Sequence, residues 1–449
     1  MTLNGESMLL MHGRIFDGTG DEEIPDGAIW IEGDEIRRVG PVDQFDDVDQ
    51  SVPRIDLAGR FVMPGMTEAH SHLSYFNASS LQDLDMNCTA ETTTISAVLN
   101  ARTMLRCGYT SSHSFGSLHA VDVAVRNAIN SGMVPGPRYV ACGRDVLGTG
   151  GMIDWNPDHL QLGMDGLAML ADNPWEVRKV IRKIRKSGAD TVKVYLDGEG
   201  MIESDLPGEL SYTQEEADAA ADEGHRRNLR IISHARSADA VIMAMKAGFD
   251  VIGHANYLND EALERMREER HRIFVTPAIH WQVGLYSNGA EFGFTHQALD
   301  SMGYKDEIAE TINSVARMRA AGIRVLPGGD FGLAWTPHGT YAKDLQNFVE
   351  LFGYTPRETL LAATRDAGAL VDFGGKVGTL EAGKSADIVV VDGDPLSDIT
   401  VLQDLDKIVT VIQGGKIFHN ALDSGPRFDL SAKPGLKASV ERQFEAASG

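Results

Sequence analysis

The chain has 449 residues, 43% of them hydrophobic and 7% aromatic, with a formal net charge of -24. This length accommodates a large domain and a smaller one, and the composition is typical of a soluble globular enzyme. The negative charge disfavours nucleic acid and anionic membranes as partners. No run approaches the ~18 apolar residues of a membrane span, and no signal peptide precedes the first strand. Because Cys88, Cys107 and Cys142 match no zinc or redox motif, we expect buried free thiols in a cytoplasmic protein.

Short predicted strands occupy both ends of the chain. Near the N-terminus, apolar segments alternate with glycine-containing turns at 8–11, 27–32, 35–39 and 54–57. A similar pattern returns at 386–392, 408–412 and 416–418. We therefore expect residues 1–60 and 371–425 to form one small β-sandwich domain. Residues 426–449 have mixed charge and form either a terminal helix or a tail.

The middle of the chain, residues 61–370, alternates between buried strands and amphipathic helices. Helical spacing of apolar residues is clear at 175–186, 239–247 and 310–320. Eight strands alternating with helices over about 300 residues predict an α/β fold of the (β/α)8 TIM barrel type. A doubly wound open sheet is the alternative, but the first strand lacks the glycine-rich turn that a nucleotide needs. The expected strands are 61–63, 110–114, 139–142, 191–196, 230–234, 251–254, 273–278 and 324–327.

Polar side chains stand on or just beyond the ends of several predicted strands. In a barrel the carboxyl ends of the strands meet at one face, so these side chains should converge. Histidine and carboxylate are common metal ligands, and a buried lysine is costly unless it is neutralised, paired or modified. Each residue alone is more often structural, but the set together predicts a metal site. Its members are His70, His72, Lys193, His234, His254 and Asp330.

This set, in this chain order, resembles the metal ligands of the amidohydrolase superfamily. Three flanking stretches resemble the branch of imidazolonepropionase, prolidase-like dipeptidases and ochratoxinase: Gly136-Pro-Arg, Gly253-His-Ala and Gly378-Thr-Leu-Glu-Ala-Gly-Lys. The resemblance runs from about residue 8 to residue 420. It implies one divalent metal held by His70, His72 and Asp330 and a second held by His234 and His254, with a carboxylated Lys193 between them. Zinc suits such ligands, and manganese or cobalt remains open.

The same resemblance implies the hydrolysis of a carbonyl–nitrogen bond. Two divalent metals can share one water, lower its pKa and polarise the scissile carbonyl. Asp330 would take the proton from that water and pass it to the leaving nitrogen. A neutral, buried lysine amine can form a carbamate, which replaces a cation by an anionic oxygen ligand. Relatives commonly form homo-oligomers, so we expect one here.

The loops after the strands depart from these relatives and carry the clues to the substrate. Met152 stands where many relatives have a histidine, and His113 and Ser114 replace a charged pair. The loop Asp154-Trp-Asn-Pro is similar to that of phenylurea and thiocarbamate (molinate) hydrolases. An apolar, aromatic mouth predicts a small, neutral substrate. The candidates for substrate binding are Met152, Trp155, Trp281, Phe331 and Trp335, and those for contact with the carbonyl are Tyr195 and His280.

The leading interpretation is therefore a hydrolase for a small, largely neutral or aromatic amide, urea or (thio)carbamate. The alternative within the class is an aminoacyl dipeptidase or an ochratoxin-type amidase, in which Arg236 would bind the substrate carboxylate. A deaminase shares the barrel, but such relatives usually lack a lysine equivalent to Lys193. A metal-binding barrel without catalysis is the alternative of another class. Metal analysis together with hydrolysis of a model anilide distinguishes it from an enzyme.

Overall fold

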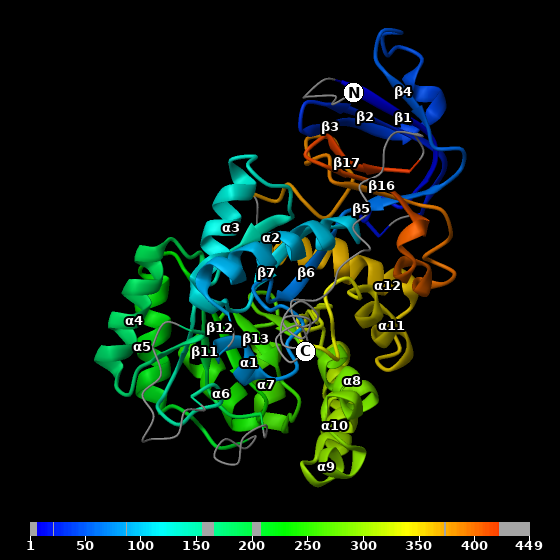
Figure 1. Ribbon diagram of the computed structural model, residues 1–449. Helices are drawn as coiled ribbons and strands as arrows, with labels where there is room; N and C mark the ends of the chain where they lie inside the picture. Colours follow the sequence, from blue (N-terminus) through cyan, green and yellow to red (C-terminus); the bar gives the residue numbers. More distant parts are fainter. Residues whose placement is uncertain are drawn as a thin grey trace, which may run out of the picture.

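Both ends of the chain meet in one eight-stranded sheet, which lies beside the larger α/β part (Figure 1). The computed structural model describes residues 7–20, 22–86, 88–154, 166–199, 208–371 and 374–421. The strand order is β17-β16-β15-β5-β1-β2-β3, and β4 pairs with β1. Strands from both end regions of the chain thus lie in one sheet. Its strands are β1 (Met8–Ile15), β2 (Ile24–Glu32), β3 (Glu35–Pro41), β4 (Arg54–Asp56), β5 (Phe61–Pro64), β15 (Ile388–Val391), β16 (Ile408–Gln413) and β17 (Lys416–Asn420).

Alternating apolar residues cover both faces of this sheet. Along β1, Met8 and Leu10 join one apolar cluster, whereas Leu9 joins another with Phe45. This is the period-two pattern that extended backbone imposes. Because β5 pairs with both β1 and β15, the ladders unite the strands in one sheet, where the sequence predicted the two sheets of a sandwich.

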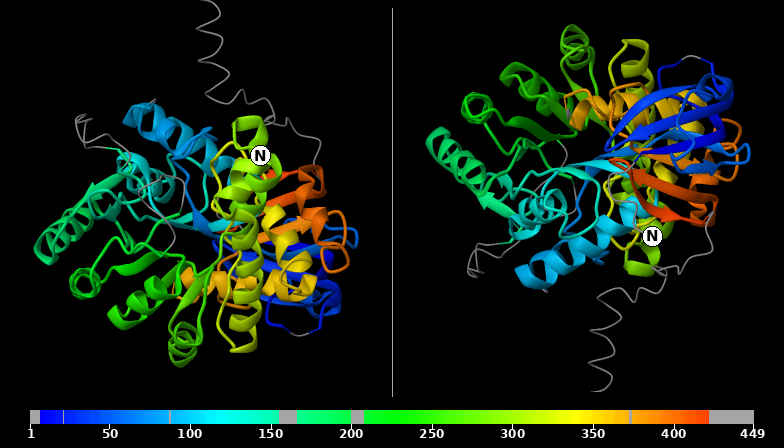
Figure 2. Two further views of the ribbon diagram at one scale, coloured as in Figure 1. Left: turned by 90° about the horizontal axis from the view of Figure 1, so that it is seen from below. Right: turned by 90° about the horizontal axis from the view of Figure 1, so that it is seen from above.

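The α/β part is built on parallel strands in two sheets. The larger sheet has the order β10-β9-β11-β12-β13-β14, and the smaller has β6-β7-β8. In both views of Figure 2 the helices lie outside these strands. The strands are β6 (Met66–Ser71), β7 (Tyr109–Ser114), β8 (Arg138–Val140), β9 (Asp145–Leu147), β10 (Ala168–Leu170), β11 (Thr191–Tyr195), β12 (Arg230–Ala235), β13 (Val251–His254) and β14 (Phe274–Thr276).

The helices start and stop at residues that suit those positions. In α4, Asn173 caps the first turn, Pro174 occupies it, and Gly188 ends the helix with φ 101°. The three helical segments predicted from apolar spacing correspond to α4, α6 and α10. The helices are α1 (Leu81–Met86), α2 (Ala90–Arg106), α3 (Val121–Asn130), α4 (Pro174–Ser187), α5 (Gln214–His225), α6 (Ala238–Ala247), α7 (Asp260–Glu268), α8 (Ile279–Asn288), α9 (His296–Ser301), α10 (Tyr304–Ala320), α11 (Ala342–Glu350), α12 (Pro356–Leu361) and α13 (Ala367–Val371).

The first predicted strand of the α/β part was assigned to the wrong sheet. Residues 61–63 belong to β5 in the sheet of the chain ends, and the first parallel strand is β6 instead. The change of sheet occurs at Gly65, where a Cβ atom would lie 2.0 Å from Thr110 Oγ1. Only glycine allows so close an approach, so the chain can leave one sheet and enter the next within one residue.

The predicted eighth strand, 324–327, forms isolated backbone contacts with its neighbours and no continuous ladder. Val325 forms an isolated bridge to Val275 of β14, and Pro327 O accepts a hydrogen bond of 3.3 Å from Ala69 N of β6. Pro327 has no N–H to donate, so the segment cannot extend a ladder towards β6. Between β8 and β11, the backbone also makes a direct contact. Asp190 N, which lies just before β11, donates a hydrogen bond of 2.8 Å to Ala141 O, which lies just beyond β8.

Two further findings concern the cysteines and the length of the apolar helices. Cys88, Cys107 and Cys142 are buried and free, as predicted. Among the described residues, no helix is both long and apolar enough to cross a membrane.

Candidate metal centre

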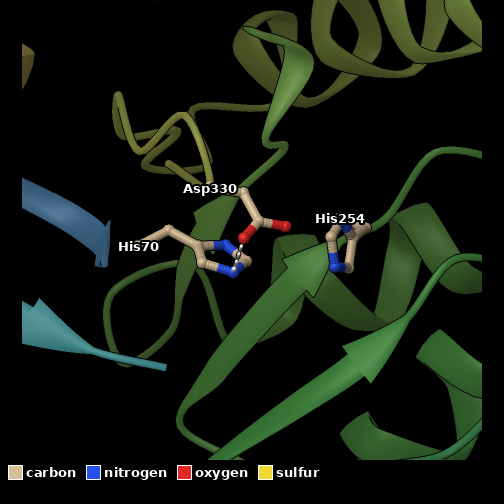
Figure 3. Close-up of side chains that lie close together, drawn as sticks. All are labelled: His70, His254 and Asp330. Carbon is tan, nitrogen blue, oxygen red and sulfur yellow. Dashed lines mark ion pairs between the residues drawn. The ribbon is translucent and has the colours of Figure 1, made fainter. Parts of the chain in front are cut away.

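Side chains from separate strands of the α/β part converge on Asp330. His70 is in β6, His72 follows it directly, and His254 ends β13. Asp330 Oδ1 lies 3.1 Å from His72 Nε2 and 3.7 Å from His70 Nε2. One ligand atom from each of His70, His254 and Asp330 falls within 4.8 Å of the other two, as the converging side chains of Figure 3 illustrate.

Two more predicted ligands lie against this group. The rings of His234 and His254 are 4.3 Å apart, and Tyr195 stacks on His234 at 4.6 Å. Lys193 Nζ lies 4.8 Å from the centre of the Tyr195 ring, and the Lys193 side chain is buried. Parallel pairing explains the grouping, because β11 and β12 bring Tyr195 opposite His234. All six predicted metal ligands are therefore near one another.

The imidazoles are in the state that metal binding requires. Burial lowers the pKa values of His70, His234 and His254 well below the ordinary value, so these rings are neutral. Within the described part of the chain, His70 Nε2, His234 Nε2 and both ring nitrogens of His254 are buried without a hydrogen-bond partner. Such atoms cost free energy unless a ligand satisfies them. The residues present therefore fit a divalent metal.

Asp330 is ionised in this setting. Burial opposes its charge, but the contacts with His70 and His72 and the nearby Lys193 favour the carboxylate, and the pKa of this carboxyl lies below its usual range. His72 is oriented by Gly116 O, 3.1 Å from its Nδ1, which directs Nε2 to Asp330. Asp330 has a φ of 55°, in the left-handed region that non-glycine residues rarely adopt. Strained backbone of this kind clusters at functional sites.

Two buried acids brace the loop that carries Asp330. Glu68 accepts hydrogen bonds from His70 N at 3.2 Å and Gly329 N at 3.1 Å. Asp344 accepts one from Gly328 N at 2.9 Å. Burial raises the pKa of Asp344 to about 7 and that of Glu68 well above its ordinary value. Neither residue is among the predicted site residues, although Glu68 lies in the same stretch after the predicted strand 61–63 as His70, whereas Asp344 lies in α11.

A cavity opens beside the cluster. It brings predicted ligands together with Met152, Tyr195 and Trp281, three of the residues expected to contact the substrate. Tyr195 donates its hydroxyl to Asp145 Oδ2 at 3.2 Å. The described residues that line the cavity are His72, Tyr75, Met152, Lys193, Tyr195, Glu199, His234, Trp281, Asp330 and Leu333.

Three of the expected substrate contacts lie away from this lining. His280 Nδ1 is 3.2 Å from Asn347 Nδ2, and its ring packs against Phe331 at 5.2 Å. Phe331 is buried in a core cluster, and Trp335 packs on Trp281 at 6.0 Å. None of these three side chains is in the described lining of the cavity. Trp155 lies outside the described residues.

Arg236 is enclosed by carboxylates. Its Nη2 lies 3.0 Å from Glu199 Oε2, its Nη1 pairs with Glu307, and its guanidinium lies over the Trp281 ring at 5.4 Å. Burial alone would lower the pKa of Arg236, but the two carboxylates raise it above its usual value. The guanidinium is thus already neutralised within the protein.

Three described lining residues were not predicted from the sequence, namely Tyr75, Glu199 and Leu333, and Glu199 is the carboxylate among them. It is buried, and burial raises its pKa to about 7 although Arg236 acts against this shift. It follows β11 at the same kind of position, beyond a strand end, that identified Asp330. Applying that rule to every acid after a predicted strand would have found it.

Comparison with known proteins agrees with this geometry. Ochratoxinase from Aspergillus niger is 27% identical over 398 residues, covering 82% of this chain and 77% of that protein. A prolidase solved with N-methylphosphonate-L-proline superposes with a TM-score of 0.83 at 26% identity, covering 92% of this chain and 100% of that one. Molinate hydrolase shares the fold, with a TM-score of 0.75 at 20% identity over 96% of this chain and 98% of the other. The sequence profile of the amidohydrolase family matches residues 61–418, so the chain belongs to the amidohydrolase family.

Proposed function

We propose that this hydrolase uses divalent metal to cleave the carbonyl C–N bond of a small, largely neutral or aromatic amide, urea or (thio)carbamate. One observation carries the proposal: within the described part of the chain, buried imidazole nitrogens without hydrogen-bond partners lie close to the ionised Asp330 at the edge of a cavity. Buried polar atoms without hydrogen-bond partners destabilise the folded protein, so their presence points to a bound ligand.

The proposal includes a closed eight-stranded barrel, which puts the six ligands at one face. Two contacts support closure: Ala69 N to Pro327 O, and Asp190 N to Ala141 O. With them, the segment 324–327 stands between β14 and β6, and β8 stands beside β11. Members of barrel families place their catalytic groups at the carboxyl ends of the strands, where these residues lie.

We assign His70, His72 and Asp330 to one metal and His234 and His254 to a second, with a carboxylated Lys193 between them. Nitrogen and oxygen ligands suit zinc, and manganese or cobalt fits the same set. When bound, such metals lower the pKa of a coordinated water and polarise the scissile carbonyl.

The chain's own residues then move the protons. Asp330 accepts the proton of the attacking water on its carboxylate and donates it to the leaving nitrogen. Tyr195 stacks on His234 and holds that ring in place, while its hydroxyl, held by Asp145, lines the cavity near the substrate carbonyl. Trp281 and Met152 exclude water from the reacting groups.

Charge favours a neutral substrate. Among the described residues that line the cavity, Lys193 is the only lysine or arginine, and the proposal converts it to an anion. Arg236, the cation that a substrate carboxylate would need, is already paired with Glu199 and Glu307. Binding a carboxylate there would require one of these pairs to break, at the cost of a buried unpaired charge.

A second candidate is an aminoacyl dipeptidase or ochratoxin-type amidase. The likeness to ochratoxinase and to a prolidase favours it. In that case the substrate carboxylate would be bound by groups other than Arg236, or Arg236 would exchange partners on binding.

The test combines metal analysis with a substrate panel. We expect about two metals per chain after purification with zinc, and hydrolysis of N-aryl ureas, thiocarbamates or anilides faster than of aminoacyl dipeptides. Faster hydrolysis of the dipeptides would establish the second candidate. A chain that binds no metal, or that binds metal and hydrolyses none of the panel, would contradict both.

A further inference from the structure

The cavity contains one buried carboxylate that the proposed mechanism does not use. Glu199 lines the cavity, and its side chain is 4% exposed. Its Oε2 lies 3.9 Å from His234 Nε2, so the group stands beside the metal cluster. Its other oxygen, Oε1, is buried and has no hydrogen-bond partner among the residues that the structure describes. A buried acceptor without a donor is costly, which suggests that a bound molecule supplies one.

The protein holds Glu199 firmly from the side away from the cavity. Arg236 contacts Oε2 at 3.0 Å and is itself paired with Glu307. Glu307 Oε1 accepts a hydrogen bond from Gln282 Nε2 at 3.3 Å, and Gln282 Oε1 accepts one from Thr311 Oγ1 at 3.1 Å. This chain of contacts fixes one oxygen of the carboxylate and leaves the other without a partner.

The neighbouring hydroxyl cannot satisfy Oε1. Tyr195, which also lines the cavity, donates its O–H to Asp145. The proposed substrates, by contrast, bring an N–H beside the carbonyl that is cleaved, and an amide N–H is a donor for a carboxylate oxygen. A substrate whose nitrogen is fully alkylated brings no donor and leaves Oε1 unpaired.

We propose that Glu199 determines specificity by accepting a hydrogen bond from an N–H of the amide, urea or carbamate that is cleaved. The inference rests on the proposed function and narrows its substrate class. The enzyme prefers substrates that keep an N–H over fully N-alkylated ones such as N,N-dialkyl thiocarbamates. A site that hydrogen-bonds a substrate N–H rejects an analogue without it more strongly than an apolar pocket rejects a methyl group.

The experiment uses the metal-loaded enzyme and a matched pair of anilides that differ only in N–H against N–CH3. The quantity measured is the ratio of kcat/KM for the two substrates. We expect the wild type to favour the N–H substrate by about 10- to 100-fold, the range of a hydrogen bond to a charged group, and Glu199→Ala to lower this preference at least tenfold. Intrinsic reactivity differs between the substrates but is common to all variants, so it cancels when variants are compared.

Glu223→Gln is the matched control. It weakens the ion pairs of a similarly buried carboxylate that is paired with Arg182 and Arg227 and lies outside the cavity lining, and it should leave the ratio within about threefold of the wild type. Glu199→Gln keeps an acceptor oxygen and the side-chain volume. It should show an intermediate ratio and serves where the alanine variant fails to fold.

The outcomes separate the two proposals. If the wild type hydrolyses neither anilide nor any urea or carbamate, the proposed function is wrong. If Glu199→Ala and Glu199→Gln keep the wild-type ratio of kcat/KM for the two anilides, the role of Glu199 is wrong while the hydrolase stands. Loss of a metal from Glu199→Gln would make Glu199 a metal ligand and would also overturn the specificity role.

Discussion

The two halves of the proposed metal centre are held by the protein in different ways. In the His70 half, formed by His70, His72 and Asp330, a carboxylate of the chain lies 3.1 Å from His72 Nε2. In the His234 half, formed by His234 and His254, the nearest described carboxylate is that of Glu199, 3.9 Å from His234 Nε2 and paired with Arg236. The first half therefore has an anion of its own, and the second half has two neutral rings.

In the proposed assignment, the His234 half therefore needs a further anionic ligand, which a covalently modified side chain can supply. A divalent ion bound by two neutral imidazoles alone would lack the compensating charge and ligand number that zinc sites have. In the proposed assignment, Lys193 supplies the missing anion once it carries a carboxylate. The backbone makes the same distinction, because Glu68 and Asp344 brace the His70 half through His70 N, Gly328 N and Gly329 N.

Asp330→Asn should have the largest effect, because it removes the only protein anion of the His70 half and the proposed proton carrier together. We expect kcat to fall by about 10³-fold or more, in line with the loss of a general base and a ligand. The measurement is kcat on an anilide, with metal content determined on the same sample. Activity within tenfold of the wild type would show that Asp330 does not carry the proton.

Lys193→Met tests the His234 half. Without the carboxylated lysine, we expect the metal content to fall from about two per chain towards one, and kcat to fall by about 10²-fold. Short carboxylic acids added to the buffer should restore part of the activity by taking the place of the carbamate. Lys183→Met, an exposed lysine on α4, is the control. Two metals in the Lys193 variant would remove the distinction between the halves.

The positions of the ligands could be predicted from the sequence because they depend on backbone order alone. His234 and His254 end strands that pair in register, and Asp330 follows a segment bridged to β14, so the strand-end rule brings them together. The rule needs only the alternation of strands and helices, which apolar spacing reveals. The prediction that residues 61–63 form the first strand of the barrel is wrong, because the pattern of a buried strand does not tell which sheet the strand joins.

The directions of side chains could not be predicted in the same way. Phe331 follows Asp330 directly, yet it forms a bridge with Ser71 and its ring enters the core. Arg236 follows a metal ligand closely, but its partners Glu199 and Glu307 come from distant parts of the chain. Which of several nearby charges pair is decided by tertiary packing, so a free arginine and a neutralised one look alike in the sequence.

Tyr195→Phe separates the contribution of the Tyr195 ring to the His234 half from that of its hydroxyl. The phenyl ring can still stack on His234, but the hydrogen bond to Asp145 is lost. We expect metal content to stay constant and kcat to fall by about tenfold, the cost of one hydrogen bond at the site. Tyr212→Phe, which removes the buried bond to Ala171 O outside the cavity lining, is the control. An unchanged kcat would limit Tyr195 to holding His234.

Asp344→Asn should have the smallest effect on activity, and its main readout is stability against pH. Burial raises the pKa of Asp344 in the folded protein to about 7 from an ordinary 3.8, so the folded state keeps a proton that the unfolded chain releases. The resulting stabilisation is complete below about pH 4 and is lost as the pH rises to about 7.

The variant lacks this titration. The stability of the wild type relative to Asp344→Asn should therefore decline between pH 4 and 7 and level off above it, measured by urea unfolding of the metal-free proteins. A difference that stays constant between pH 4 and 7 would mean that Asp344 braces the His70 half as a carboxylate throughout that range. The loop of Asp330 would then depend on a buried charge in the same way that the His234 half depends on Lys193.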